Sequence, residues 1–109
     1  MNNCLFCKLY NNILEKNIIK ENDNFYVIED INPQAPLHYL IISKEHHENI
    51  LELSNESAKV IKDMILLGKE IVNDCGISDS GFRWVINSGK DGGQSVFHFH
   101  MHAYFLLNS

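Results

Sequence analysis

The chain of 109 residues has the length of a single domain, and with 45% hydrophobic and 21% charged residues it has the composition of an ordinary globular protein. Its net charge of −5 argues against a nucleic-acid backbone or an anionic membrane as the main partner. No apolar run is long enough to cross a membrane and residues 1–4 carry no signal-peptide pattern, so we expect a cytoplasmic location.

The first half of the chain predicts several short elements. Leu5, Leu9 and Ile13 recur at helical spacing, and the turn-forming residues 22–24 separate two strand-like runs. Two prolines exclude regular structure from residues 30–36. The expected elements are a short helix or turn over residues 4–14, strands at residues 18–21, 25–28 and 39–42, and a helical turn at residues 48–51.

The second half predicts one long helix, from about Ser54 to Cys75, followed by two strands. Ser54 or Asn55 is a plausible N-cap and Gly76 a plausible residue just past the C-cap. The apolar positions that define its core face are Ile61, Met64, Ile65, Gly68, Ile71, Val72 and Cys75. Strands follow at residues 82–86 and 96–107. The whole chain, residues 1–109, therefore predicts a single α+β domain with a five-stranded antiparallel sheet and its helices on one side.

Three histidines at alternate positions, His98, His100 and His102, are the most informative feature of the sequence. In an extended strand they would share one face, roughly 7 Å apart, close enough to surround one small anion or one metal. A solvent-facing polar stripe is the alternative, but such stripes normally consist of Lys, Glu, Thr or Ser. Half of the six histidines fall within these five residues, which favours a functional site.

A glycine-rich segment, residues 89–95, leads directly into the histidine row. Glycines let backbone N–H groups approach an anion closely, and Ser95 adds a hydroxyl donor. A lone Gly-Gly pair is more often only a turn, but next to three imidazoles it predicts a phosphate cradle. The segment is neither a Walker loop nor a dinucleotide fingerprint.

Residues 92–104, with the pattern His-φ-His-φ-His in which φ is apolar, resemble the signature of the histidine triad family. Residues 30–38 resemble the corresponding loop of its Hint branch, residues 43–46 a Pro-Lys-x-His segment in which Ser43 replaces proline, and residues 87–89 an Asn-x-Gly motif. The motifs occur in the same order from Cys4 to Tyr104.

The resemblance implies a nucleotidyl hydrolase of adenosine 5′-phosphoramidates and aminoacyl adenylates, acting through a covalent nucleotidyl-histidine and needing no metal for the chemistry. His100 resembles the nucleophile, and His102 and His38 would contact nonbridging phosphate oxygens. Ser95 would bind the bridging atom, and Asp30 the ribose. The nucleotide-binding residues that the resemblance implies are Asp30, Ile31, Asn87, Gly93, Gln94, Ser95, His100 and His102. From the residues alone, Asp30 could instead start the Asn-Pro turn and His38 could be a buried core histidine.

Cys4 and Cys7 form a Cys-x-x-Cys pair, which is half of a tetrahedral zinc site. The resemblance implies that His46 and His98 complete the ligand set, as in many bacterial-type members of the family. The alternative is a pair of free thiols on a short helix. With zinc bound, His98 would be a structural ligand, not a general base.

Two other functions stay open from the sequence: a purine-nucleotide-binding regulator whose hydrolysis is incidental, and a dinucleoside polyphosphate hydrolase. The Pro33-Gln34-Ala35-Pro36 loop disfavours the second. We also expect a homodimer, because the long helix and the strand that contains Trp84 carry more apolar surface than one small sheet can cover. The resemblance implies that two five-stranded sheets join into one.

Overall fold

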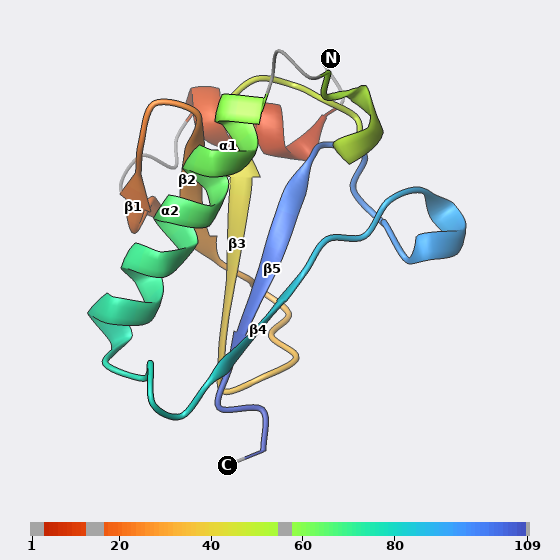
Figure 1. The fold of residues 1–109 in the computed structure, drawn as a ribbon. Helices are drawn as coiled ribbons and strands as arrows, with labels where there is room; N and C mark the ends of the chain where they lie inside the picture. The colour runs from red at the N-terminus through yellow and green to blue at the C-terminus, as the bar shows by residue number, and fades with distance from the viewer. Residues whose placement is uncertain (1–3, 13–16, 55–57, 109) are drawn as a thin grey trace.

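The computed structural model describes residues 4–12, 17–54 and 58–108. These residues form a five-stranded sheet flanked by two α-helices, which confirms the expected α+β class and strand number (Figure 1). In chain order the elements are α1 (Leu5–Asn12), β1 (Lys20–Glu21), β2 (Phe25–Glu29), β3 (Leu37–Ser43), the 3₁₀ turn η2 (Ile50–Glu52), α2 (Ala58–Cys75), β4 (Phe82–Val85), the 3₁₀ turn η4 (Lys90–Gly92) and β5 (His100–Phe105).

The sheet is antiparallel throughout, with strand order β1-β2-β3-β5-β4. The expected hairpin is β1 and β2. Its turn is closed by Asn22, whose Oδ1 accepts hydrogen bonds from the backbone N–H groups of Asn24 and Phe25 at 3.1 and 3.0 Å. β3 lies between β2 and β5, so the middle of the sheet brings residues 37–43 beside residues 100–105. Within the described residues, β4 pairs on one side only.

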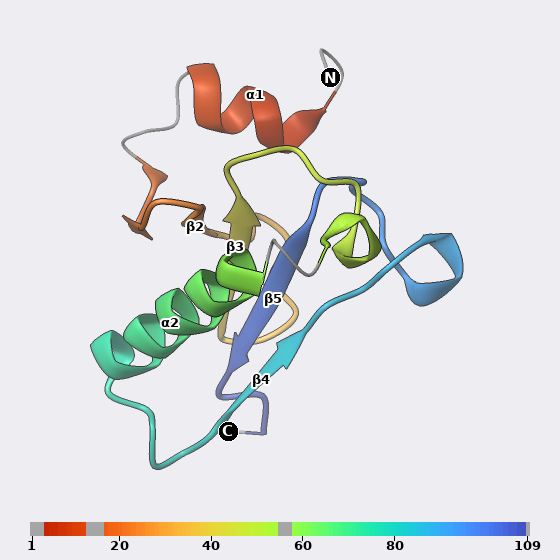
Figure 2. The same ribbon diagram turned by 45° about the horizontal axis from the view of Figure 1, so that its top comes forward.

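The two helices cover opposite faces of the sheet, so the expectation that they lie on one side is wrong for α1. Side chains that alternate along the strands divide between the faces: Phe25 and Val27 of β2 join the cluster under α2, whereas Tyr26 packs with Phe6 of α1. Figure 2 shows α1 well apart from α2. The apolar pattern of an eight-residue segment is too short to assign it to one face of a sheet.

The long helix is confirmed over Ala58–Cys75, and Gly76 with a φ of 67° ends it as expected. The N-cap candidate Asn55 lies outside the described residues. Ile65 is 36% exposed, so its assignment to the core face is wrong, and Leu67 is fully buried instead. Gly68 lets the Trp84 ring lie directly on the helix, because a Cβ at this position would be 2.8 Å from Trp84 Cζ2.

The last strand begins at His100, not at Val96 as expected. The preceding segment folds back on itself, since the His98 N–H donates to the Val96 carbonyl at 2.9 Å. The Phe99 N–H donates to the carbonyl of His47 at 2.6 Å, and Phe99 accepts in turn from Ser43 N–H at 3.1 Å. The segment that contains His98 is therefore held by hydrogen bonds to the end of β3 and to the loop after it, and not by continuous strand pairing.

Neither described helix is both long and apolar enough to cross a membrane.

Candidate active site

A cavity of about 640 Å³ lies on the α1 face of the sheet, where β3 and β5 run side by side. Because β5 alternates, His100 and His102 point to this face while Met101 and Ala103 point into the core under α2. The sequence-predicted residues that line the cavity are Asp30, Ile31, Ser95, His100 and His102; Asn87, Gly93, Gln94 and His38 do not line it.

Apolar side chains of α1 form one wall of the same cavity. Leu5, Phe6 and Leu9 all contribute to it, together with Ile28 and Leu40 from the sheet. The sequence analysis used the spacing of Leu5 and Leu9 only to predict a helix and did not assign these residues to the site. Their position next to the Cys-x-x-Cys pair is the signal that could have placed them there. The cavity is therefore apolar at one end and lined by imidazoles, a carboxylate and a hydroxyl at the other.

His100 is held in one tautomer by the segment just before its strand. Its Nδ1 lies 2.7 Å from the backbone carbonyl of His98, which can only accept, so Nδ1 carries the proton and Nε2 carries the lone pair. Burial of the ring lowers the pKa of His100, partly offset by this hydrogen bond. A buried, neutral imidazole with its free nitrogen at a cavity is the arrangement expected of a nucleophile.

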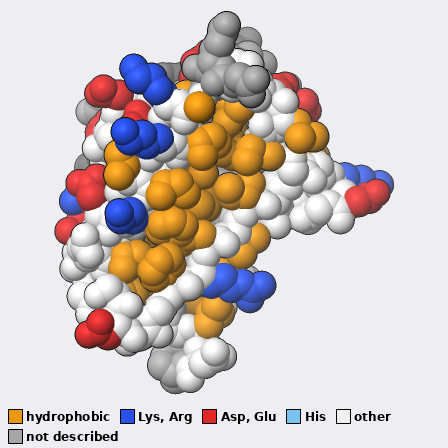
Figure 3. Space-filling view, viewed as in Figure 1, with side chains coloured by type: hydrophobic (Ala, Val, Ile, Leu, Met, Phe, Trp, Pro, Cys, Tyr) orange, Lys and Arg blue, Asp and Glu red, His pale blue; other side chains and the backbone are white. Residues whose placement is uncertain are grey.

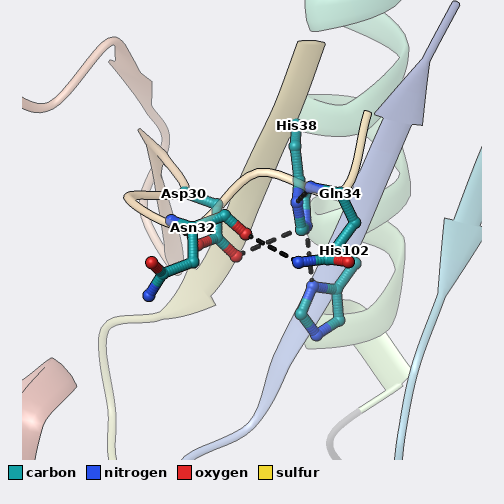
Figure 4. A network of polar contacts seen from close by, with 5 residues as sticks. All are labelled: Asp30, Asn32, Gln34, His38 and His102. Atoms are coloured by element: carbon teal, nitrogen blue, oxygen red, sulfur yellow. Dashed lines mark hydrogen bonds and ion pairs between the residues drawn. The ribbon is translucent and has the colours of Figure 1, made fainter. Parts of the chain in front are cut away.

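A relay of hydrogen bonds fixes the tautomers of two further histidines (Figure 4). The Gln34 N–H donates to His38 Nδ1 at 3.1 Å, so the proton of the neutral His38 ring is on Nε2. That N–H donates to His102 Nδ1 at 3.0 Å, which leaves the proton of His102 on Nε2. Burial, with the nearby His100 and His38, lowers the pKa of His102 to about 4, and burial also lowers the pKa of His38. His102 is therefore a neutral ring with an N–H available to a ligand.

We expected His38 to contact phosphate directly, but its hydrogen bonds leave neither ring nitrogen available for that contact. Its ring is 4% exposed, does not line the cavity and spends both nitrogens on Gln34 and His102. Asp30 lies beside it, with Oδ2 at 3.4 Å from His38 Nε2. These three side chains are close enough to hold a metal ion, but the Gln34 N–H keeps the proton on His38 Nε2, where a metal would need a lone pair.

Asp30 also has the local role that the sequence offered as an alternative. Its Oδ1 accepts the Asn32 N–H at 2.8 Å and so starts the turn before Pro33. Its side chain nevertheless lines the cavity, so the turn role and a ligand-binding role are compatible.

The glycine-rich loop is held from behind by Gln94. Its buried side chain accepts the Gly89 N–H at 2.8 Å and donates to the carbonyls of Glu48 and Val96 at 2.7 and 3.0 Å. Gly93 has a φ of 86°, which favours glycine, and it faces the Asn87 side chain. The loop thus presents exposed Ser95 to the cavity, while the side chain of Gln94 supports the backbone.

The four predicted metal ligands are brought together beside the active site. His98 Nδ1 lies 3.2 Å from Cys4 Sγ, 3.5 Å from Cys7 Sγ and 3.2 Å from His46 Nδ1, and the distance from Cys7 Sγ to His46 Nδ1 is 3.4 Å. Tetrahedral zinc, with sulfur at about 2.3 Å and nitrogen at about 2.0 Å, separates its ligand atoms by about 3.3–3.8 Å. The four observed separations, 3.2–3.5 Å, lie at or slightly below the lower end of this range, so a bound ion would need only small movements of the ligand atoms.

The protonation of His98 also fits a metal ligand. Its Nε2 lies 2.6 Å from the Ser43 carbonyl, so Nε2 carries the proton and Nδ1 offers its lone pair to the cluster. Burial lowers the pKa of His98 to about 4, which keeps the ring neutral. Burial and the neighbouring Cys4 raise the pKa of Cys7 to about 11, so a bound cation would have to displace the thiol proton. Cys75, the third cysteine, packs against the core under α2.

The sequence and the fold are similar to those of known proteins. Residues 3–106 match the family model described as "Scavenger mRNA decapping enzyme C-term binding". The chain is 39% identical over 102 residues to the protein HitA of Neisseria gonorrhoeae, covering 94% of each chain. Its fold is similar to a HIT family hydrolase from Clostridium thermocellum, with a TM-score of 0.92 and 37% identity over 99% of this chain and 94% of that one. A HIT family hydrolase from Legionella pneumophila has a TM-score of 0.88 and 34% identity, with 94% and 92% covered.

Proposed function

The chain belongs to the histidine triad family, and we propose that it hydrolyses nucleotide phosphoramidates of the adenosine 5′-phosphoramidate and aminoacyl-adenylate type. The observation that carries the proposal is the tautomer of His100, a residue that lines the cavity: its Nδ1–H is bound to the His98 carbonyl, which leaves the lone pair on Nε2. A relative named as a HIT family hydrolase, similar over nearly the whole chain, supports hydrolysis as the reaction class.

In the proposed first step His100 Nε2 attacks the α-phosphorus, a P–N bond to His100 forms and the P–N or P–O bond to the leaving group breaks. The leaving amine or carboxylate departs with the electron pair, and a phosphoramidate amine takes up one proton from the solvent. In the second step water attacks the same phosphorus and gives one proton to the solvent, releasing AMP and the free imidazole. Neutral imidazole suits both steps, since it is a good nucleophile and a good leaving group near neutral pH.

The other cavity residues would position and stabilise the phosphate. His102 would donate its Nε2–H to a nonbridging oxygen, and the Ser95 hydroxyl would bind the bridging atom. Asp30 would bind the ribose hydroxyls, with Ile31 and the α1 wall against the base. His38 would act through His102 by fixing its tautomer. Asn87, Gly93 and Gln94 would support the loop instead of touching the base or ribose with their side chains.

We propose that Cys4, Cys7, His46 and His98 hold a structural Zn²⁺, because their donor atoms already lie close to tetrahedral separations. The cation would tie the N-terminal segment to the segment before β5. The proposed reaction steps involve only cavity side chains and do not pass through this site. Metal analysis of untagged protein should find about one zinc per chain.

We further propose a homodimer formed by the α2 and β4 surface. Hydrophobic side chains gather on the face seen in Figure 3. Ile65 and Leu66 of α2 and Phe82 of β4 are exposed large hydrophobic residues. β4 also has an open edge in the described part of the sheet. Sedimentation should give twice 12.6 kDa at micromolar concentration; a stable monomer would contradict the proposal.

Substitution of the nucleophile tests the reaction. His100→Ala should abolish turnover of adenosine 5′-phosphoramidate and leave AMP binding largely intact, because the other contacts do not use the attacking nitrogen. His47→Ala is the matched control, since His47 is a histidine outside the cavity. Diadenosine polyphosphate, tested in parallel, separates the phosphoramidase from a dinucleoside polyphosphate hydrolase. Near wild-type turnover by His100→Ala would refute the mechanism.

A further inference from the structure

Helix α1 belongs to two sites at once. Cys4, just before the helix, and Cys7 within it face His46 and His98 in the metal cluster. The intervening and following residues Leu5, Phe6 and Leu9 line the nucleotide cavity. A helix of eight residues is stiff over this distance, so its position relative to the sheet sets both the metal ligand geometry and the cavity wall.

Phe6 connects the two sites directly. Its ring is 4% exposed and meets the His98 ring edge-on at 5.8 Å and 78°, and the His100 ring at 5.0 Å and 82°. The Phe6 carbonyl also accepts a 2.8 Å hydrogen bond from the Tyr26 hydroxyl. One side chain therefore packs against both a metal ligand and the nucleophile, and its backbone is fastened to β2.

His98 provides a second connection. Its ring is a ligand in the cluster, and its carbonyl accepts the Nδ1–H of His100 at 2.7 Å. A shift of His98 on loss of the metal would therefore be transmitted to the ring that carries the attacking nitrogen.

A bound metal would add to the packing of Phe6, Leu9 and Tyr10 that already holds α1 against the sheet. Helices shorter than about 12 residues are marginal on their own, so α1 depends on its tertiary contacts. Of its described side chains only that of Phe6 is buried. A metal that joins Cys4 and Cys7 to His46 and His98 converts its binding free energy into docking of the helix.

We propose that the metal at Cys4, Cys7, His46 and His98 and a nucleotide in the adjacent cavity bind cooperatively, with α1 as the shared element and Phe6 as a positioning residue for His100. The proposal rests on the nucleotide-hydrolase function proposed above. Coupling between two binding sites is reciprocal, so AMP must raise the affinity for zinc by the same factor by which zinc raises the affinity for AMP. The substrate site would then respond to metal availability without any metal step in the chemistry.

The test is an equilibrium competition for zinc between the folded protein and a chromophoric chelator, with and without saturating AMP. Typical couplings correspond to roughly 5–150-fold, so we expect AMP to raise the apparent zinc affinity at least about fivefold. A parallel titration of the chelator with zinc and AMP corrects for weak binding of zinc by AMP itself. AMP affinity is measured by calorimetry on the zinc-loaded protein and on protein depleted of zinc.

Phe6→Leu and Lys8→Ala form the matched pair of variants on α1. Phe6→Leu keeps an apolar side chain but removes the ring edge from His100, so the factor by which AMP raises zinc affinity should fall toward one. Lys8 is exposed, does not line the cavity and is no ligand, so Lys8→Ala should keep the wild-type factor. A merely structural role of Phe6 would lower zinc affinity equally with and without AMP.

The outcomes separate the two proposals. If AMP does not bind the zinc-loaded protein, the nucleotide-hydrolase proposal fails and the coupling with it. If AMP binds well but zinc affinity is the same with and without it, the coupling is overturned while the proposed function stands. If zinc-depleted protein unfolds, AMP raises the apparent zinc affinity simply by binding the folded state, so the comparison of Phe6→Leu with Lys8→Ala decides the question: equal factors in the two variants overturn the coupling through Phe6.

Discussion

The Gln94 side chain offers a sharp test of how the glycine-rich loop is held. It makes three hydrogen bonds that join the loop to backbone groups on either side of it and in a distant segment: it accepts from Gly89 N–H and donates to the carbonyls of Val96 and Glu48. All three bonds are between 2.7 and 3.0 Å, and the residue is 5% exposed. Gln94→Ala deletes all three and leaves one donor and two acceptors to find other partners.

The expected cost follows from these contacts. Each hydrogen bond contributes about 1 kcal/mol, and the loop around it is exposed, so water can satisfy part of what is lost. We expect a loss of about 2–3 kcal/mol in the free energy of unfolding, or a drop of about 10 °C in Tm. Ser95 follows Gln94 directly, so at a temperature where the variant is folded turnover should fall on the order of 10- to 100-fold.

Two variants control this experiment, which uses urea unfolding at fixed protein concentration and turnover of adenosine 5′-phosphoramidate. Gln94→Glu keeps the acceptor for Gly89 N–H but sets a carboxylate oxygen against two carbonyl oxygens, so at pH 7 it should be no more stable than Gln94→Ala. Lys90→Ala, in the exposed part of the loop, should unfold like the wild type. If Gln94→Ala costs less than about 0.5 kcal/mol, the side chain does not hold the loop.

Two further predictions concern packing and pH. Gly68→Ala gains about 1 kcal/mol of helix propensity but forces a Cβ to within 2.8 Å of the Trp84 ring, and overpacking costs typically 1–3 kcal/mol, so urea unfolding should show a net destabilisation. The pKa of His102 is about 4 in the folded protein and near 6.5 in an unfolded chain, so the unfolded state binds more protons between these values. The free energy of unfolding should therefore fall as the pH is lowered from about 6.5 to 4, and this slope should be smaller in His102→Gln; equal slopes would refute the contribution of His102.

Local patterns predicted the elements that have strong local causes. The Asn-rich turn at residues 22–24 gave the first hairpin because Asn22 closes it with its own side chain. The helix face of α2 was largely correct because the 3.6-residue period is fixed by geometry, and the error at Ile65 arises at the margin of that face, where one residue of rotation separates core from surface.

The site residues were predicted less completely. Sequence spacing predicts the face of a strand or helix on which a side chain lies, but not the groups that the side chain contacts. Gln94 and Asn87 were assigned to the nucleotide by resemblance, yet the Gln94 side chain turns inward to the backbone of Glu48, which is distant in the chain. His38 was expected at the phosphate and lies behind His102. The α1 wall was missed because the Cys-x-x-Cys pair was used only to predict a metal site and not to place the helix on the face of the sheet that carries His98.

The sequence pattern correctly placed the three histidines on one face, but two different roles are proposed for them: His98 as a metal ligand and His100 as the nucleophile. The three rings do lie on the α1 side, since Phe6 contacts both His98 and His100 and the His100 ring lies 5.0 Å from His102. They do not surround one ligand, because the backbone bends before His100 and the His98 ring is committed to Ser43 and the cysteines. The bend places the His98 carbonyl beside His100 Nδ1, so the same residue that belongs to the proposed metal site sets the tautomer of the proposed nucleophile.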